Sequence, residues 1–147
     1  MKRTIVLLLT AGFVLFFTAG MVSAHCEIPC GIYDDQLRHD LIAEHATTIE
    51  KSMNQIVELS KGGMTDYNQL VRWISNKEHH ANEIQHIVSQ YFMTQRIKPT
   101  ADKYAQKLKL LHGMLVYAMK CKQTTDLGNV AQLRSLLKEF WKLYKKG

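Results

Sequence analysis

The chain has 147 residues, a formal net charge of +6 and a hydrophobic fraction of 46%. This length and composition are typical of a single globular domain with one core. Its basic residues are spread along the sequence and concentrate only at 138–146, so a solvated helix face and tail explains them better than a nucleic-acid surface. Three cysteines are an odd number, which argues against a fully paired disulfide framework.

Residues 1–24 predict a secretory signal peptide that is cleaved. Two basic residues open the segment, an apolar stretch follows at 5–17, and Val22 and Ala24 are the small residues of a cleavage site. The apolar stretch is too short for a comfortable membrane span. We therefore expect export to the periplasm or the extracellular space, no membrane contact after cleavage, and a mature chain that starts with a free amine on His25.

Amphipathic helices are predicted for the first half of the mature chain, because its apolar residues recur every three or four positions. The first helix covers 36–61 and stops at the glycine pair 62–63. Its apolar stripe contains Leu37, Leu41, Ile42, Ala46, Ile49, Met53, Ile56 and Val57. The second helix starts at an N-cap on Thr65 or Asp66 and places Leu70, Val71, Ile74, Ala81, Ile84, Val88, Tyr91 and Phe92 on one face.

Two further helices are predicted for the second half. Pro99 ends the second helix and Thr100 is a natural N-cap for the third. Residues 124–126 are predicted to end the third helix and to cap the fourth, whose apolar residues continue to Tyr144. Four amphipathic helices with short connections bury their stripes together in an all-α, antiparallel up-and-down four-helix bundle, which we place at 34–147.

The segment 25–33, His-Cys-Glu-Ile-Pro-Cys-Gly-Ile-Tyr, precedes this bundle and concentrates metal ligands. The amine of His25, with the amide nitrogen and thiolate of Cys26, can close two fused five-membered chelate rings around one ion. Cys30 can return a second sulfur, because the neighbouring proline and glycine make a tight hook sterically easy. A planar set of two nitrogens and two sulfurs, with the His25 imidazole above it, favours nickel, since two thiolates tend to reduce copper.

The motif His-Cys-x-x-Pro-Cys-Gly-x-Tyr at a processed N-terminus, followed by a helical domain of this length, resembles nickel superoxide dismutase. The matching residues are His25, Cys26, Pro29, Cys30, Gly31 and Tyr33, with a weaker match at Ser89-Gln90-Tyr91-Phe92. The resemblance implies one nickel ion per subunit, bound by His25, Cys26 and Cys30. It implies that this nickel cycles between Ni(II) and Ni(III) while superoxide is converted to oxygen and hydrogen peroxide.

The resemblance also implies features outside the ligand set. Tyr33 would lie beside the open face of the metal as a further catalytic residue, and the subunits would assemble as a homohexamer. A carboxylate and an arginine would orient the axial imidazole, and the sequence offers Asp40, Glu44, Arg72 and Glu78 for this pair without assigning it.

Two other interpretations of the hook stay open. An exported nickel or copper carrier could use the same ligands without turnover. A disulfide between Cys26 and Cys30 could instead pin the N-terminus of the bundle without a metal. A di-iron site on the second helix is disfavoured, because the chain contains only one Glu-x-x-His of the required type, at 83–86.

The remaining potential ligands are expected to be structural. Cys121 is expected to pack as a small hydrophobe, as free cysteines usually do. His39, His45 and His112 are isolated in the sequence and are expected to be packing or surface residues.

Overall fold

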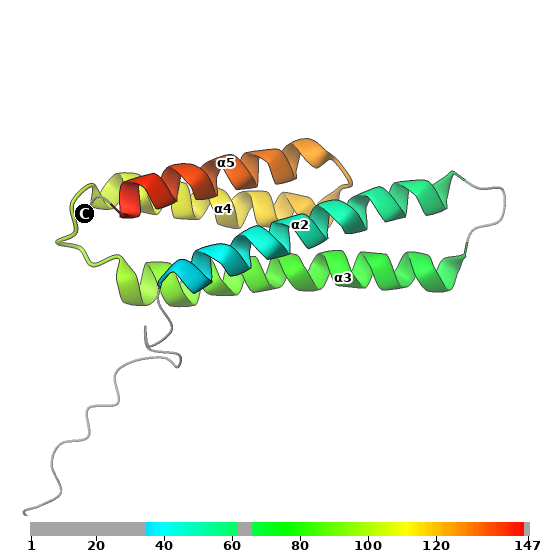
Figure 1. Cartoon of the computed structure of the whole chain (residues 1–147), viewed down its shortest axis with the longest axis horizontal. Coiled ribbons are helices and arrows are strands. Elements are labelled where there is room, and N and C mark those ends of the chain that lie inside the picture. The colour runs from blue at the N-terminus through cyan, green and yellow to red at the C-terminus, as the bar shows by residue number, and fades with distance from the viewer. Residues whose placement is uncertain (1–34, 62–65, 146–147) are drawn as a thin grey trace, which may run out of the picture.

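A computed structural model describes residues 35–61 and 66–145, which form an antiparallel bundle of four helical rods (Figure 1). The rods are α2 (Asp35–Ser60), α3 (Tyr67–His86) continued by the π-helix η1 (Ile87–Arg96), α4 (Tyr104–Gln123) and α5 (Leu127–Tyr144). Each rod runs opposite to the one before it, so the predicted all-α bundle is confirmed for these residues. The predicted leader, the hook and the glycine pair at 62–63 lie outside them.

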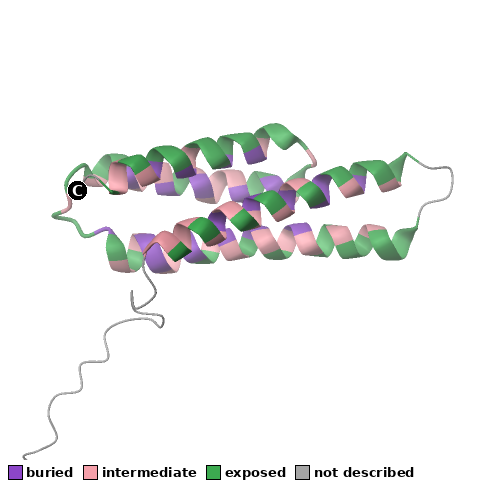
Figure 2. Cartoon of the chain, in the orientation of Figure 1, coloured by how far each residue is buried: buried purple, intermediate pink, exposed green. Residues whose placement is uncertain are grey.

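The core lies along the axis of the bundle and receives apolar side chains from every rod (Figure 2). Side chains without solvent exposure include Ile42, Ala46, Ile49, Met53, Ala81, Ile84, Val88, Phe92, Leu111, Met114, Ala118, Cys121, Leu133 and Phe140. They recur every three or four residues, as the sequence predicts. In the described ranges no helix is long and apolar enough to cross a membrane.

Part of the predicted apolar stripe on α2 and α3 is exposed instead of buried. Val57, Val71 and Ile74 are exposed large hydrophobic side chains, and Val71 retains 60% of its surface. Figure 1 shows the reason, because α2 and α3 extend past the turn between α4 and α5. At that end each of the two helices has only the other to pack against.

Two predicted N-caps are confirmed. The carboxylate of Asp66 accepts a hydrogen bond of 3.1 Å from the backbone N–H of Gln69 at the start of α3. The carboxylate of Asp126 accepts one of 2.8 Å from the N–H of Gly128 at the start of α5. Each cap satisfies a backbone donor that has no partner within its helix.

The predicted N-cap at Thr100 is wrong. The chain turns through 98–103, and α4 begins only at Tyr104. The residue before it, Lys103, has left-handed backbone angles (φ 52°, ψ 34°) and caps the helix without a side-chain hydrogen bond. Pro99 ends the preceding helix as predicted, but reversing the chain takes more residues than a cap at Thr100 would allow.

The second predicted helix changes its hydrogen-bond period before it ends. In η1 the backbone N–H of Ile97 bonds to the carbonyl of Phe92 at 2.9 Å, five residues back. The side chains of Thr94 and Gln95 also donate to carbonyls five residues earlier. Helices of this period are rare and are frequently found at functional sites.

Replacement of Phe92 by alanine tests the aromatic core. Phe92 has no solvent exposure, and its ring contacts those of Phe140 and Tyr144 edge to face at centroid distances of 5.0 and 5.7 Å. We expect Phe92→Ala to lower the free energy of unfolding by about 3–5 kcal/mol, measured by urea unfolding of the metal-free protein. Tyr67→Ala is the control, because Tyr67 is 73% exposed; equal losses in the two variants would contradict this account of the core.

Candidate metal centre

The four residues that the sequence assigns to the site, His25, Cys26, Cys30 and Tyr33, lie outside the described residues. The structure does describe the place where this segment joins the bundle. Helix α2 begins at Asp35, two residues after Tyr33. Its first turn lies at the end of the bundle where η1 and α5 finish (Figure 1).

A polar cluster ties this first turn of α2 to the bundle, and we call it the Asp35 clamp: Asp35, Tyr91, Arg96 and Tyr144. The Tyr91 hydroxyl donates a hydrogen bond to Oδ1 of Asp35. Nη2 of Arg96 and the hydroxyl of Tyr144 both donate to Oδ2, each at 2.7 Å. One carboxylate therefore joins α2 to both η1 and α5.

The electrostatics of the clamp keep its ion pair charged. Burial alone would raise the pKa of Asp35, but hydrogen bonds from Tyr91, Arg96 and Tyr144 outweigh it and hold that pKa below its usual value. Burial and the neighbouring carboxylate raise the pKa of Tyr91 to about 12 and also raise that of Tyr144. At neutral pH the carboxylate and the guanidinium are ionised, and both phenols keep the protons that they donate.

The π-helical period aligns two members of the clamp. Tyr91 and Arg96 are five residues apart, which is one hydrogen-bond period of η1. In an α-helix these positions would diverge by about 140° around the axis. In η1 the Arg96 guanidinium lies 5.9 Å from the centroid of the Tyr91 ring, and the guanidinium of Arg38 lies 5.2 Å from that centroid.

None of the four residues offered by the sequence for an arginine–carboxylate pair forms one. Asp40 instead accepts a hydrogen bond from Gln36 at 2.7 Å and lies 2.8 Å from Nδ1 of His39. Among the described residues, the ion pairs between arginine and carboxylate are Asp35–Arg96 and Glu50–Arg134. Asp35 and Arg96 are 61 positions apart in the chain, so no local spacing in the sequence reveals this pair.

Two of the histidines expected to be packing or surface residues, His39 and His45, contact other rings. The Nδ1 atoms of His45 on α2 and His80 on α3 are 2.7 Å apart, so one ring donates and the other accepts. The ring of His79 contacts that of His80 at a centroid distance of 5.3 Å, and His39 stacks on Trp141 at 4.6 Å. His39 therefore packs between α2 and α5, and His45 and His80 pack between α2 and α3. Across 35–61 and 66–145, no group of three or more His, Cys, Asp or Glu side chains could hold a metal ion.

Cys121 is buried, as expected. Its side chain has no solvent exposure, and burial raises the pKa of its thiol to about 11. The thiol therefore stays protonated at neutral pH, whereas a metal ligand must be a thiolate. The other two cysteines of the chain, Cys26 and Cys30, belong to the hook and are the remaining candidates for thiolate ligands.

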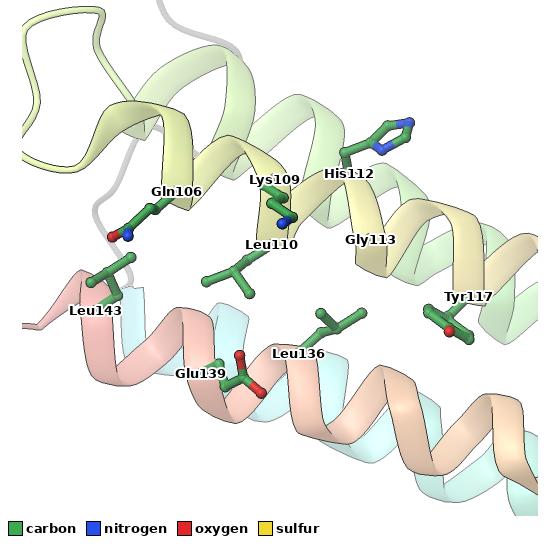
Figure 3. Close-up of a pocket in the computed structure, with 9 residues that line it drawn as sticks. All are labelled: Gln106, Lys109, Leu110, His112, Gly113, Tyr117, Leu136, Glu139 and Leu143. Atoms are coloured by element: carbon green, nitrogen blue, oxygen red, sulfur yellow. The ribbon is translucent and has the colours of Figure 1, made fainter.

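A groove of about 610 Å³ lies between α4 and α5 (Figure 3). Its lining consists of Gln106, Lys109, Leu110, His112, Gly113, Tyr117, Leu136, Glu139 and Leu143. The close-up shows the ring of His112 directed away from the groove. The lining includes no cysteine and no member of the Asp35 clamp, so the groove is not our candidate for the metal centre.

An all-α bundle preceded in the sequence by one histidine and two cysteines within six residues has the composition of a metalloprotein. The family model for nickel-containing superoxide dismutase matches residues 20–147, and the chain therefore belongs to this family. The match covers the hook and all the described helices, and it makes the protein an oxidoreductase that acts on superoxide. No curated protein and no solved structure matches the chain.

The ligand chemistry of the hook fits the metal of this family. Thiolate and imidazole groups suit nickel and other late transition metals, whereas magnesium and calcium prefer oxygen ligands. His25, Cys26 and Cys30 supply nitrogen and sulfur within six consecutive residues. We therefore expect nickel to bind at the hook.

The pair of His45 and His80 predicts a pH dependence of stability. Burial, followed by the charge of a neighbouring histidine, lowers the pKa of each imidazole below its ordinary value of 6.5. The unfolded chain then takes up protons at a higher pH than the folded chain. The contribution of the two neutral histidines to the free energy of unfolding is fully present above about pH 6.5. It is lost as the pH falls through their lower folded-state pKa values.

Urea unfolding of the metal-free protein above and below pH 6.5 measures this effect. We expect His80→Gln to reduce the acid-side loss of stability, because it removes one of the two rings. His112→Gln is the control, because His112 is exposed and lies outside the pair. A His80→Gln variant with the parent's pH dependence would show that the pair does not cause the effect.

Proposed function

We propose that the protein converts two superoxide ions and two protons to oxygen and hydrogen peroxide at a nickel ion, one per subunit, bound at 25–33. The family match over 20–147 is the observation that carries this proposal, because it includes the complete hook motif. When bound, nickel would supply a Ni(II)/Ni(III) redox couple for the transfer of one electron between two superoxide ions.

Four residues of the hook are proposed to bind the metal or to order the substrate. His25 supplies its terminal amine and its imidazole, Cys26 its amide nitrogen and thiolate, and Cys30 a second thiolate. The hydroxyl of Tyr33 would order water or an incoming anion beside these ligands. The guanidinium of Arg38 lies over the ring of Tyr91 close to the start of α2, and positive charge there favours the approach of an anionic substrate.

The chain is processed and assembled before it becomes active. Cleavage after Ala24 creates the amine on His25 that the ligand set requires, and it places the enzyme in the periplasm or outside the cell. Because export through the general pathway delivers an unfolded chain, nickel is loaded after export. Assembly as a homohexamer is proposed from the resemblance of the hook and bundle to the family.

One alanine inserted before His25 in the processed protein tests the role of the terminal amine. The insertion moves the amine off the histidine and leaves the bundle sequence unchanged. We expect superoxide dismutase activity to fall by about 100-fold or more, because changes beyond the direct ligands already cost 10–100-fold in metal sites. Helical content and the urea midpoint should stay as in the parent, and unchanged turnover would refute this ligand.

Exchange of single cysteines separates the hook from the bundle. Cys30→Ser should abolish nickel retention and activity, because it removes a thiolate ligand. Cys121→Ala is the matched control and should keep both, because this thiol is buried and protonated. Bound nickel and activity are measured in the same sample of each variant. A parent protein that binds nickel without turnover would favour the carrier. A Cys26–Cys30 disulfide that excludes nickel would favour the structural role.

A further inference from the structure

The carboxylate of Asp35 accepts hydrogen bonds from three donors of its own chain. Tyr91 occupies Oδ1, while Arg96 and Tyr144 share Oδ2. A carboxylate offers about four acceptor sites, so three of them are already used. The Asp35 side chain is also only 19% exposed. These contacts suit an anchor for the backbone rather than a group that binds substrate or metal.

Asp35 is close enough to the hook along the chain for its position to affect that of the hook. Two peptide units separate Asp35 from Tyr33, so their Cα atoms are at most about 7.6 Å apart. Cys30 is five residues from Asp35. A movement of the first turn of α2 would therefore displace the end of the hook, and misplacement of a reacting group by about 1 Å can cost about 100-fold in rate.

The bundle contains a second ion pair between an arginine and a carboxylate, and this one joins α2 to α5. Nη2 of Arg134 on α5 donates to Oε2 of Glu50 on α2 at 2.6 Å and to the Thr47 hydroxyl at 3.2 Å. Glu50 lies about 22 Å along α2 from Asp35, given a rise of 1.5 Å per residue. Because this second pair also links α2 to α5, the Asp35 clamp is distinguished by its place beside the hook and by its donors from η1.

The helix that delivers those donors is itself unusual. The π-helix η1 spans ten residues, Ile87–Arg96, and its period brings Tyr91 and Arg96 to the same side, toward Asp35. An α-helical continuation would separate the two donors around the axis. The π-helix therefore supplies two of the three donors to the carboxylate of Asp35, the residue that starts α2.

We propose that the Asp35 clamp positions the hook: it fixes the first turn of α2, and with it Tyr33 and Cys30, relative to the bundle. This inference rests on the proposed function and assigns Asp35 as a positioning residue. Asp35 acts through the backbone that leads into the hook. Arg96, Tyr91 and Tyr144 act by holding the carboxylate of Asp35.

The test compares Asp35→Asn with Glu50→Gln in the processed, nickel-loaded protein. Each substitution removes one carboxylate charge from α2 and weakens one bridge to an arginine, but only the first touches the clamp. Four quantities are measured: the rate of nickel release to a chelator, the electron paramagnetic resonance spectrum of the oxidised protein, kcat/KM for superoxide, and the urea midpoint of the metal-free chain.

We expect Asp35→Asn to speed nickel release about tenfold or more, to change the resonance spectrum and to lower kcat/KM about tenfold or more, as changes beyond direct ligands do in other metal sites. Glu50→Gln should shift the urea midpoint while leaving the spectrum and nickel release as in the parent. Tyr144→Phe removes a single donor and provides a milder variant if Asp35→Asn does not fold; it should change the spectrum in the same direction.

The outcomes separate this inference from the proposed function. Parent-like spectra and nickel release in both clamp variants would overturn the inference while the parent's activity upholds the function. The same spectral change in Glu50→Gln would also overturn it, because the effect would then follow bundle stability alone. A parent protein without nickel or turnover would overturn the proposed function and the inference with it.

Discussion

The hydrogen bonds to Asp35 form where the ligand-bearing segment of the chain meets its folded part. An exposed ion pair contributes about 0–1 kcal/mol, because water screens it and two long side chains lose freedom. The pair of Asp35 and Arg96 gains from the half-buried carboxylate and from two phenolic donors at fixed positions. These hydrogen bonds fix the relative positions of three rods of the bundle at the point where α2 begins.

The aromatic core directly supports this junction. Phe92, with no solvent exposure, packs edge to face against Phe140 and Tyr144, and Tyr144 stacks on Trp141 at 5.6 Å. Aromatic pairs of this kind contribute about 0.5–1.5 kcal/mol beyond the burial of their area. The rings hold the backbone of η1 and α5, so the phenolic hydroxyls of Tyr91 and Tyr144 reach Asp35 without a long, freely moving side chain.

Chemistry and fold occupy different parts of this chain. The hook supplies every ligand of the proposed metal centre, while the bundle buries its apolar stripes and keeps Cys121 as a protonated thiol. Four-helix bundles serve many unrelated functions, so the fold alone would not have indicated superoxide chemistry. The family match is informative because it joins the hook and the bundle in one segment, 20–147.

The sequence by itself determined what depends on neighbours along the chain. The four helices and the caps at Asp66 and Asp126 follow from spacing over a few residues, and so does the ligand set that we propose for the hook. Only the tertiary structure decided the pairs of Asp35 with Arg96 and His45 with His80, which are 61 and 35 residues apart. It also decided the π-helical period of η1 and the exposure of Val71, because both depend on which helix packs alongside, and local periodicity carries no information about that partner.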